Sequence, residues 1–328
     1  MAQLNPQISE LDAVTGIGKA VGDPLRATIL VLLREDSFSV SELCAVLEVP
    51  QPALSHHLKI LLQAGLIARR REASNLFYRR DNSAGDPLKL ALFTALDNTD
   101  IEPWWRPGME RVHTERSLHC REFFARNAAD IASLQTQIAE PEAYCETVLD
   151  MARRVAEAGG GDLLALEVGP GEGHLINGLA RHYKQVHGVD SSAAMLARTA
   201  AASATLTNVT LHNTDFFEFQ PGRGCDLIVA AMTLHHLPSP AAFFAQARRL
   251  LNPGGSLIIA ELRHHDQHWA SDVCGDLWLG FEPAELAQWA TNAGLTGCES
   301  QFLAQKNGFQ IQIQHYRADQ PSNLKEVS

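Results

Sequence analysis

Residues 163–180 read LLALEVGPGEGHLINGLA, an apolar run that leads directly into a glycine-rich turn and then into a helical pattern. Gly169, Gly171 and Gly173 would let the backbone approach a ligand closely, and a helix starting near Gly173 would point its N–H groups at that ligand. A second apolar run ends at Asp190, whose carboxylate is placed to accept both hydroxyls of a ribose. The stretch therefore predicts a strand, turn and helix that bind a nucleotide.

Apolar runs alternate with helical segments along the rest of this half of the chain. The runs predicted as strands are 163–168, 185–190, 208–213, 225–230 and 256–261. Such alternation predicts a parallel sheet covered by helices on both faces. Two further runs around Lys306-Asn307-Gly308, within 296–316, predict an antiparallel hairpin at the sheet edge. We expect residues 159–316 to form an α/β Rossmann-like domain with a seven-stranded, mostly parallel sheet.

The glycine turn differs from a dinucleotide site. The pattern G-x-G-x-x-G needs Gly at position 174, where the chain has His174, and a bulky side chain there leaves poor room for a pyrophosphate. The spacing instead fits E-x-G-x-G-x-G starting at Glu167, which resembles class I S-adenosylmethionine-dependent methyltransferases. Later segments carry the same resemblance, which covers about 162–316: VTLHNTDFF (209–217), CDLIVAAMTLHHLPSP (225–240) and RRLLNPGGSLIIAEL (248–262).

This resemblance implies S-adenosylmethionine or S-adenosylhomocysteine as the ligand. The glycines would pass its methionine end, Asp190 would hold the ribose, Met195 would pack near the adenine and Asp215 would fix the adenine amino group. The complete set of expected cofactor-binding residues is Glu167, Gly169, Gly171, Gly173, Asp190, Ser191, Met195, Asp215 and Phe216. His235 and His236 could serve as catalytic bases, but His-His-Leu at this place is common in the family whatever the substrate, so the catalytic residues stay unassigned.

The first part of the chain has a different pattern. Helices are predicted over 24–34, 40–47, 51–64 and 86–97, with a hairpin of strands 66–71 and 76–80. In the helix 51–64, Leu54, Leu58 and Leu61 share one side and should face a core. The other side carries a short, polar and basic arc without glutamate, which suits insertion into a DNA major groove; its residues are Gln51, Pro52, Ser55, His56 and Lys59.

Charge is distributed unevenly. The net charge of −11 argues against a protein that coats nucleic acid indiscriminately, yet residues 51–80 hold six basic side chains against the single acidic Glu72. The arginines could follow DNA phosphates, or they could protect an exposed strand edge. The predicted DNA-binding residues are Gln51, Ser55, His56, Lys59, Arg69, Arg70, Arg71 and Arg79, whereas His57 projects towards the core flank and is expected to be structural.

Three segments of this part resemble the winged helix-turn-helix fold of ArsR/SmtB-type repressors: GKAVGDPLRATILVLL (18–33), the run from Ser39 to Arg71, and NLFYRR (75–80). The resemblance covers about 15–97 and implies a homodimer, paired through its first and last helices, that binds double-stranded operator DNA. The family's arsenic site needs three cysteines, but residues 39–44 offer only Cys44. Its zinc site needs a histidine on the last helix, and 86–97 has none. The sequence predicts no metal site.

The predicted organisation is an α+β winged helix-turn-helix domain (1–97), a linker (98–110), a helical insert (111–158), the α/β domain (159–316) and a tail (317–328). Within the insert, Arg116, Phe123 and Phe124 could roof the nucleotide site, or they could belong to a plain amphipathic core helix. Six cysteines without a C-x-x-C pair are typical of free thiols in a reducing cytoplasm. No apolar run reaches the roughly 20 residues of a membrane helix, and residues 1–14 do not resemble a secretory signal.

Two functions fit these patterns. In the first, a transcriptional repressor senses S-adenosylmethionine or S-adenosylhomocysteine through its C-terminal domain; a resemblance to bacterial ArsR-type regulators with methyltransferase domains points to genes of the methionine and methyl cycle. In the second, the chain is an active methyltransferase of a small molecule, and DNA binding is self-regulation. An arsenic methyltransferase would require several converging thiols, and Cys120, Cys145, Cys225, Cys274 and Cys298 could converge only by accident of folding. The two main hypotheses differ in whether the space beyond the methyl group is open to a second substrate.

Overall fold

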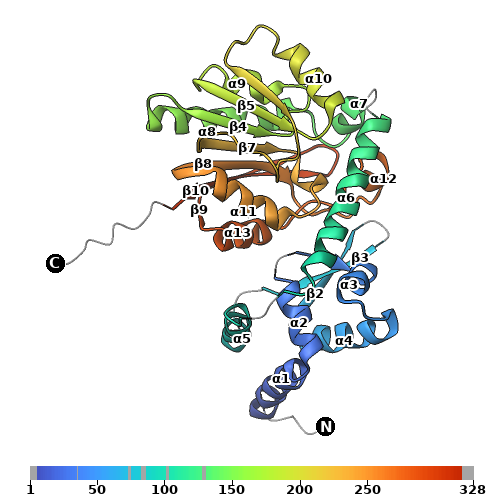
Figure 1. The fold of residues 1–328 in the computed structure, drawn as a ribbon. Coiled ribbons are helices and arrows are strands. Elements are labelled where there is room, and N and C mark those ends of the chain that lie inside the picture. Colours follow the sequence, from blue (N-terminus) through green and yellow to red (C-terminus); the bar gives the residue numbers. More distant parts are fainter. Residues whose placement is uncertain are drawn as a thin grey trace, which may run out of the picture. The chain divides into compact units, whose positions relative to one another are not determined.

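The computed structural model describes residues 6–34, 36–72, 75–82, 86–100, 103–127 and 131–319. The chain divides into two compact units, Met1–Glu115 and Arg116–Ser328, whose helices and strands are labelled in Figure 1. In the part of the chain that the structure describes, no helix is both long and apolar enough to cross a membrane.

The first unit contains a three-stranded antiparallel sheet in the order β1-β3-β2. Strands β2 and β3 pair from Ile67 with Arg80 to Glu72 with Asn75, so the predicted hairpin is confirmed; its connecting residues 73–74 lie outside the described residues. The elements of this unit are α1 (Pro6–Val21), α2 (Pro24–Leu32), β1 (Phe38–Ser39), α3 (Val40–Leu47), α4 (Gln51–Gln63), β2 (Ile67–Glu72), β3 (Asn75–Arg80) and α5 (Pro87–Asp97).

Local sequence explains where the helices of this unit begin and end. Helix α3 starts with a capping box, in which the Ser39 hydroxyl accepts the backbone N–H of Glu42 and the Glu42 carboxylate accepts the backbone N–H of Ser39. Helix α4 ends just before Gly65, whose φ of 65° suits glycine. The predicted inner side of α4 is buried against the core, as the exposures of Leu54 (0%), Leu58 (1%) and Leu61 (0%) show.

The second unit is built on a seven-stranded sheet in the order β6-β5-β4-β7-β8-β10-β9. Strand β10 runs antiparallel to both of its neighbours, and the remaining pairs are parallel. The predicted Rossmann-like architecture and its edge hairpin are therefore confirmed. The strands are β4 (Leu164–Val168), β5 (Gln185–Asp190), β6 (Val209–Asn213), β7 (Cys225–Ala231), β8 (Leu251–Leu262), β9 (Leu295–Ala304) and β10 (Gln310–Ala318).

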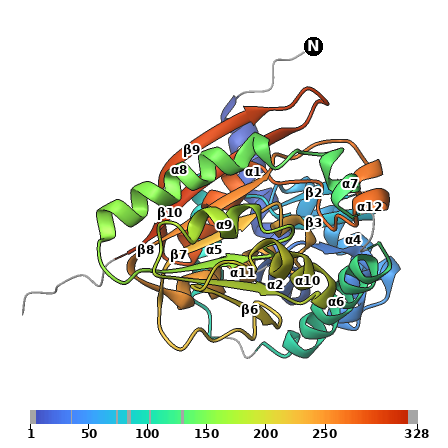
Figure 2. The ribbon, with the colours of Figure 1, turned by 90° about the horizontal axis from the view of Figure 1, so that it is seen from above.

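Helices cover both faces of this sheet, as Figures 1 and 2 show. Helices α8, α9 and α10 lie on one face, and α11 and α13 pack together on the other. The apolar core on the α8 side includes Val148 and Met151 from α8 and Leu175 and Ile176 from α9. The helical elements are α8 (Glu142–Gly159), α9 (His174–Leu179), α10 (Ala193–Ala202), the short 3-10 helix η1 (Leu234–His236), α11 (Pro240–Leu250), α12 (Trp269–Cys274) and α13 (Pro283–Asn292).

The segment predicted as helical throughout 111–158 contains separate helices. Helix α6 (Arg106–Asn127) begins inside the stretch expected to be a linker, and α7 (Ile131–Thr136) and α8 follow it. Residues 137–141 are not helical, because the residue before Pro141 is disfavoured in the helical conformation. Residues 128–130 lie outside the described residues. The periodicity predicted helices here but not their ends.

Candidate functional site

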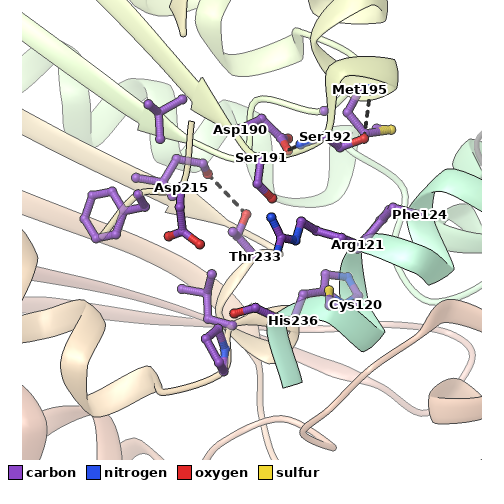
Figure 3. Close-up of a pocket in the computed structure, with 18 of the residues that line it drawn as sticks. Cys120, Arg121, Phe124, Asp190, Ser191, Ser192, Met195, Asp215, Thr233 and His236 are labelled. Carbon is purple, nitrogen blue, oxygen red and sulfur yellow. Dashed lines mark hydrogen bonds between the residues drawn. The ribbon is translucent and has the colours of Figure 1, made fainter. Parts of the chain in front are cut away.

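A cavity of about 120 Å³ opens at the carboxyl ends of the parallel strands of the second unit. The glycine turn after β4, Asp190 at the end of β5, Asp215 after β6 and Thr233 after β7 contribute to its wall (Figure 3). The sheet order reverses direction between β4 and β7, and open α/β sheets bind their ligands at such a switch point.

The fold brings most of the expected cofactor-binding residues together around this cavity. Those that line it are Gly169, Gly171, Asp190, Ser191, Met195, Asp215 and Phe216. Glu167 instead lines a second, adjoining cavity. Gly173 lines neither of these two cavities; it precedes α9 with a φ of 81°, and a Cβ there would lie 3.1 Å from the Cβ of Ala202 on α10. Its part is therefore to let two helices pack closely.

The glycine turn is shaped by a close approach to Thr233. Gly169 has a φ of 67°, and a Cβ at this position would lie 2.7 Å from Thr233 Oγ1, so only glycine fits without strain. The Thr233 hydroxyl lies 3.2 Å from the Val168 carbonyl and 3.0 Å from that of Ala231, to either of which it can donate. Met232, which also lines the cavity, has a φ of 52°, an uncommon conformation for a residue with a side chain.

Asp190 is the acidic group of this cavity that burial affects most clearly. Burial raises the pKa of its carboxyl from 3.8 to about 6, although the backbone N–H of Ser192, which donates to Oδ1 at 2.7 Å, opposes the shift. The carboxylate is thus held in a fixed orientation at low hydration. Such a group is well suited to accept hydrogen bonds from ligand hydroxyls.

Asp215 and Phe216 form another part of the cavity wall. The carboxylate of Asp215 accepts the backbone N–H of Phe217 at 3.0 Å, which fixes the turn after β6. Phe216 is buried and packs against Phe243, with ring centroids 5.0 Å apart. Met195 is buried at the start of α10. Apolar and aromatic surface therefore lies beside one carboxylate, an arrangement that suits a heteroaromatic base with an amino group.

Helix α6 supplies the roof of the cavity, and only one of the three proposed roof residues lines it. Phe124 lines the cavity. Arg116 is buried, donates to the Pro238 carbonyl at 2.7 Å and lies 5.0 Å from the ring centre of Trp278, and Phe123 packs beside Gly275; both are packing residues. Ser117, Cys120 and Arg121 complete the roof. Figure 3 shows Arg121 reaching from α6 towards Ser191 and Thr233.

A second cavity of about 490 Å³ adjoins the first. The two share Gly169, Gly171, Met232 and His236 in their walls. Glu167 faces this second cavity; it is buried, burial raises its pKa well above 4.5, and its Oε2 has no hydrogen-bond partner in the described part of the chain. Space therefore continues past the glycine turn.

His235, His236 and Asp276 meet in the wall of this second cavity, and Glu261 contacts His235. His235 Nδ1 lies 2.6 Å from Glu261 Oε1, and its Nε2 lies 3.7 Å from Asp276 Oδ1. Burial alone would lower the pKa of His235, but the Glu261 and Asp276 carboxylates outweigh it and raise this pKa to about 9. Burial, and then the neighbouring His235, lower the pKa of His236. Burial raises the pKa of Asp276 to about 7, an effect that His235 opposes.

The outer face of α4 in the first unit is the predicted DNA-reading surface. Gln51, Ser55, His56 and Lys59 are all exposed, as this prediction requires. His57 is partly buried, with its Nδ1 3.7 Å from an Asp23 carboxylate oxygen, which agrees with the structural role expected for it.

The arginines of the hairpin do not form one uniform basic surface. Arg69 and Arg71 are exposed. Arg70 forms an ion pair with the buried Glu72, and Arg80 is buried, with a nitrogen 2.8 Å from Asp97. Arg79 is partly buried. Arg69 and Arg71 are therefore better placed than Arg70 for a partner outside the fold.

Comparisons with known proteins agree with both halves of this description. Residues 137–311 match the family described as a methyltransferase domain. The chain belongs to this family. Residues 23–69 match the bacterial regulatory proteins of the arsR family. An uncharacterized HTH-type transcriptional regulator of Methanocaldococcus jannaschii is 43% identical over 76 residues, which are 23% of this chain and 85% of that protein. The first unit therefore belongs to the arsR family.

More distant relatives extend over the methyltransferase domain. A ubiquinone biosynthesis O-methyltransferase of Bradyrhizobium sp. is 24% identical over 210 residues, which are 63% of this chain and 75% of that protein. A solved complex of the Haloferax volcanii Trm112 methyltransferase activator with a methyltransferase gives a TM-score of 0.50 at 15% identity, covering 61% of this chain and 98% of that one; this likeness concerns the fold alone. The family match supports S-adenosylmethionine as the cofactor expected from the glycine motif.

Several residues of the methyltransferase domain's cavities escaped the sequence reasoning. The only sequence signal for Thr233 is the glycine at position 169, which indicates that some other group packs closely against the backbone there without naming it. Arg121 lies on α6, whose charged residues are spread all around the helix and mark no inner face. Asp276 lies in a loop far along the chain from His235. These residues join the site through the fold, and no local pattern names them.

Proposed function

We propose that this protein is a DNA-binding transcriptional repressor whose methyltransferase domain binds S-adenosylmethionine and S-adenosylhomocysteine, and that the bound ligand controls its affinity for operator DNA. Genes of the methionine and methyl cycle are the proposed targets, because their products set the ratio of these two ligands.

The observation that carries this proposal is the course of helix α6. Met109 and Val112, in its first half, are buried in the core of the helix-turn-helix unit. Cys120, Arg121 and Phe124, in its second half, line the ligand cavity. A ligand that changes the position of the cavity roof therefore acts on a helix whose other end belongs to the DNA-binding unit. Such a change shifts DNA affinity only if the ligand prefers one state.

The cavity chemistry supports the choice of ligand. Asp190 offers a carboxylate to the ribose hydroxyls, and Asp215 with Phe216 offers an acceptor and an apolar wall to the adenine. The turn at Gly169 and Gly171 leaves the backbone accessible to the methionine part. Of the roof residues, Arg121 adds a cation that reaches into the cavity (Figure 3).

The DNA-binding form is proposed to be a homodimer. Helices α1 and α5, the first and last of the winged unit, leave large apolar side chains in solvent: Leu11 is 62% exposed, Val14 51% and Leu90 69%. Apolar side chains this exposed on two helices of one unit are best explained by a covering partner. Sedimentation of the full chain should give a dimer, and the double substitution Leu11→Glu with Leu90→Glu should give a monomer.

The sensor proposal is tested by measuring operator affinity three times: without ligand, with saturating S-adenosylmethionine and with saturating S-adenosylhomocysteine. The operator is a duplex selected by the wild-type protein from genomic fragments, which also identifies the target genes. Typical couplings change affinity roughly 5- to 150-fold, and we expect the two ligands to differ. Three equal values would exclude sensing.

The second cavity favours a second candidate function, methyl transfer to a small acceptor. It shares the wall at Gly169 and Met232 with the ligand cavity and provides about 490 Å³ of further space, so the region past the glycine turn is not closed. Incubation with methyl-labelled S-adenosylmethionine and a set of small phenols, amines and thiols tests this function. A labelled product formed by the wild type but not by an Asp190 variant would show that the chain is an enzyme. If all label stays in S-adenosylmethionine, sensing remains as the proposed function of this domain.

A further inference from the structure

The wall of the second cavity holds an arrangement of ligand atoms that no function described so far uses. Side-chain atoms of His235, His236 and Asp276 lie within 4.8 Å of one another, and all three residues are buried. Among the described residues these three form the one such group of His, Cys, Asp and Glu side chains. No cysteine takes part, so the converging thiols of an arsenic methyltransferase are not found in the described part of the chain.

The orientation of His235 leaves one ring nitrogen for a metal. Its Nδ1 faces Glu261 at 2.6 Å. Glu261 is fully engaged as an acceptor, because its oxygens also receive the backbone N–H groups of Leu262 at 2.7 Å and His235 at 3.2 Å. The proton on Nδ1 is therefore assigned to the bond with Glu261, so a metal ion would displace the proton on Nε2 and bind there. A carboxylate that holds the far nitrogen of a histidine is the usual support of a metal-binding imidazole.

Asp276 lies opposite this nitrogen, and its carboxylate receives no hydrogen bond from the described residues. It is 3% exposed, and neither of its carboxylate oxygens has a hydrogen-bond partner among the described residues. Its Oδ1 lies 3.7 Å from His235 Nε2 and 3.9 Å from His236 Nδ1. A buried carboxylate without hydrogen bonds is strongly disfavoured unless a cation lies beside it. In the ligand-free protein that cation is the His235 ring, 3.7 Å away, and a bound divalent ion would take over its role.

The backbone holds these groups in place independently of any cation. The His235 carbonyl accepts the N–H groups of Leu277 at 2.9 Å and Trp278 at 3.2 Å, and the Ser271 hydroxyl donates to the Asp276 carbonyl at 2.9 Å. Backbone hydrogen bonds thus hold the loop that carries Asp276 against η1. His236 Nδ1 lies 3.3 Å from the Gly275 carbonyl, a long contact that a metal bond could replace.

We propose that His235 Nε2, His236 Nδ1 and Asp276 bind a divalent transition-metal ion of the zinc type, supported by Glu261. Zinc bonds of about 2.0–2.1 Å in a tetrahedron place ligand atoms about 3.4 Å apart. The distances of Asp276 from the two histidines, 3.7 and 3.9 Å, would contract by a few tenths of an ångström, and the set as a whole, which lies within 4.8 Å, by at most about 1.4 Å. Metal binding would release the Nε2 proton of His235, after which two neutral imidazoles, two carboxylates and one divalent ion give a net charge of zero. The fourth position faces the cavity, where water or an acceptor's anionic oxygen or sulfur would bind.

The site is tested on the untagged full chain, stripped of metal by dialysis against a chelator and titrated with zinc and, separately, with cobalt(II). We expect one tight equivalent of zinc and the visible absorption bands of four-coordinate cobalt. Asp276→Asn, which keeps the volume of the side chain, should weaken zinc binding at least tenfold and abolish the cobalt bands, and His236→Ala should do the same.

The control variant is His187→Ala. His187 and His212 form another close pair of imidazoles, 3.2 Å apart at Nδ1 and Nε2, and they lie outside the cavity. This variant should bind zinc as the wild type does. Zinc should also raise the Tm of the wild type but not that of Asp276→Asn. Near-ultraviolet circular dichroism of Asp276→Asn and His236→Ala reports whether these variants are folded. Failure of the folded wild type to bind zinc, or equal affinity in wild type and Asp276→Asn, overturns the site. Neither result depends on S-adenosylmethionine or DNA.

Discussion

The carboxylate of Asp190 accepts a hydrogen bond from the backbone N–H of Ser192 at 2.7 Å, and this bond fixes the acid at the end of β5, in the wall of the cavity of about 120 Å³. Its pKa is raised to about 6 because burial removes water from the charged form. The residue is therefore held in a state that costs stability, and no ion pair among the described residues offsets that cost. Groups of this kind are typical of binding sites.

Replacing Asp190 by Asn should separate these two effects. The amide oxygen of Asn can still accept the Ser192 N–H, but it forms weaker hydrogen bonds to ribose hydroxyls, which the charged acceptor strengthens by about 1.5–3 kcal/mol each. Calorimetry should show the affinity for S-adenosylhomocysteine reduced by well over tenfold. At pH 8 the Tm of the ligand-free protein should rise by a few degrees, since the buried charge is gone. Unchanged affinity would place the ligand elsewhere.

The affinity for S-adenosylhomocysteine should also depend on pH. The folded-state pKa of Asp190 lies above 3.8, at about 6, so the carboxyl becomes protonated in the folded protein as the pH falls through 6. Because the proton and the ribose compete for the same carboxylate, affinity at pH 5 should be about tenfold below that at pH 7.5. The same titration on Asp190→Asn is the control, and a dependence of equal size there would assign the effect to another group.

The exposed arc of α4 should determine sequence preference, and the hairpin arginines should determine general affinity. With the operator that the wild type selects from genomic fragments, Ser55→Ala or His56→Ala should lose about 1–3 kcal/mol per base contact and relax the preference. Arg69→Ala and Arg71→Ala should weaken all duplexes alike and reduce the salt dependence by about one counterion each.

Arg70→Ala is the matched control for these arginines. Its guanidinium is paired with the buried Glu72, so we expect a loss of stability and a smaller loss of DNA affinity than at either neighbour. Gel-shift titrations at two salt concentrations measure all of these variants. If Ser55→Ala and His56→Ala both bind the operator as the wild type does, α4 is not the recognition helix.

The sequence predicted those parts of the site whose chemistry is local. The glycine turn, Asp190 and Asp215 follow strand ends, and parallel strands bring their carboxyl ends to one edge, so their convergence follows from the fold class. The alternation of side chains along a strand also predicts which hairpin arginines share a face. Residues two apart share a face, so Arg70 and Glu72 were bound to lie together, with Arg69 and Arg71 on the other face.

The remaining features needed the tertiary structure. Asp276 and His235 meet because a loop after α12 is fastened to η1 by backbone hydrogen bonds, and backbone bonding of irregular segments leaves no periodic signal in the side chains. The division of the predicted helical stretch was missed because apolar spacing indicates a face and not an end. The linker predicted over 98–110 differs most from the structure, because α6 begins at Arg106 and its first residues are helical.

That helix allows a direct test of communication between the two activities. Glu115 is exposed and lies in α6 between Val112, which is buried in the DNA-binding unit, and Arg121, which lines the ligand cavity. Proline within a helix removes a hydrogen bond, clashes with the preceding turn and kinks or breaks it. Glu115→Pro should therefore leave S-adenosylhomocysteine affinity and ligand-free operator affinity within about twofold of the wild type, while the change in operator affinity on ligand binding falls towards none.

Glu115→Ala removes the same side chain without breaking the helix, and it should keep the full coupling. By linkage, operator DNA must change ligand affinity by the factor with which ligand changes operator affinity, so the coupling can be measured from either side and the two values must agree. A wild type with coupling and a Glu115→Pro variant that retains it would show that the signal does not pass along α6. A wild type without coupling would instead remove the sensor function and leave methyl transfer as the function of the second domain.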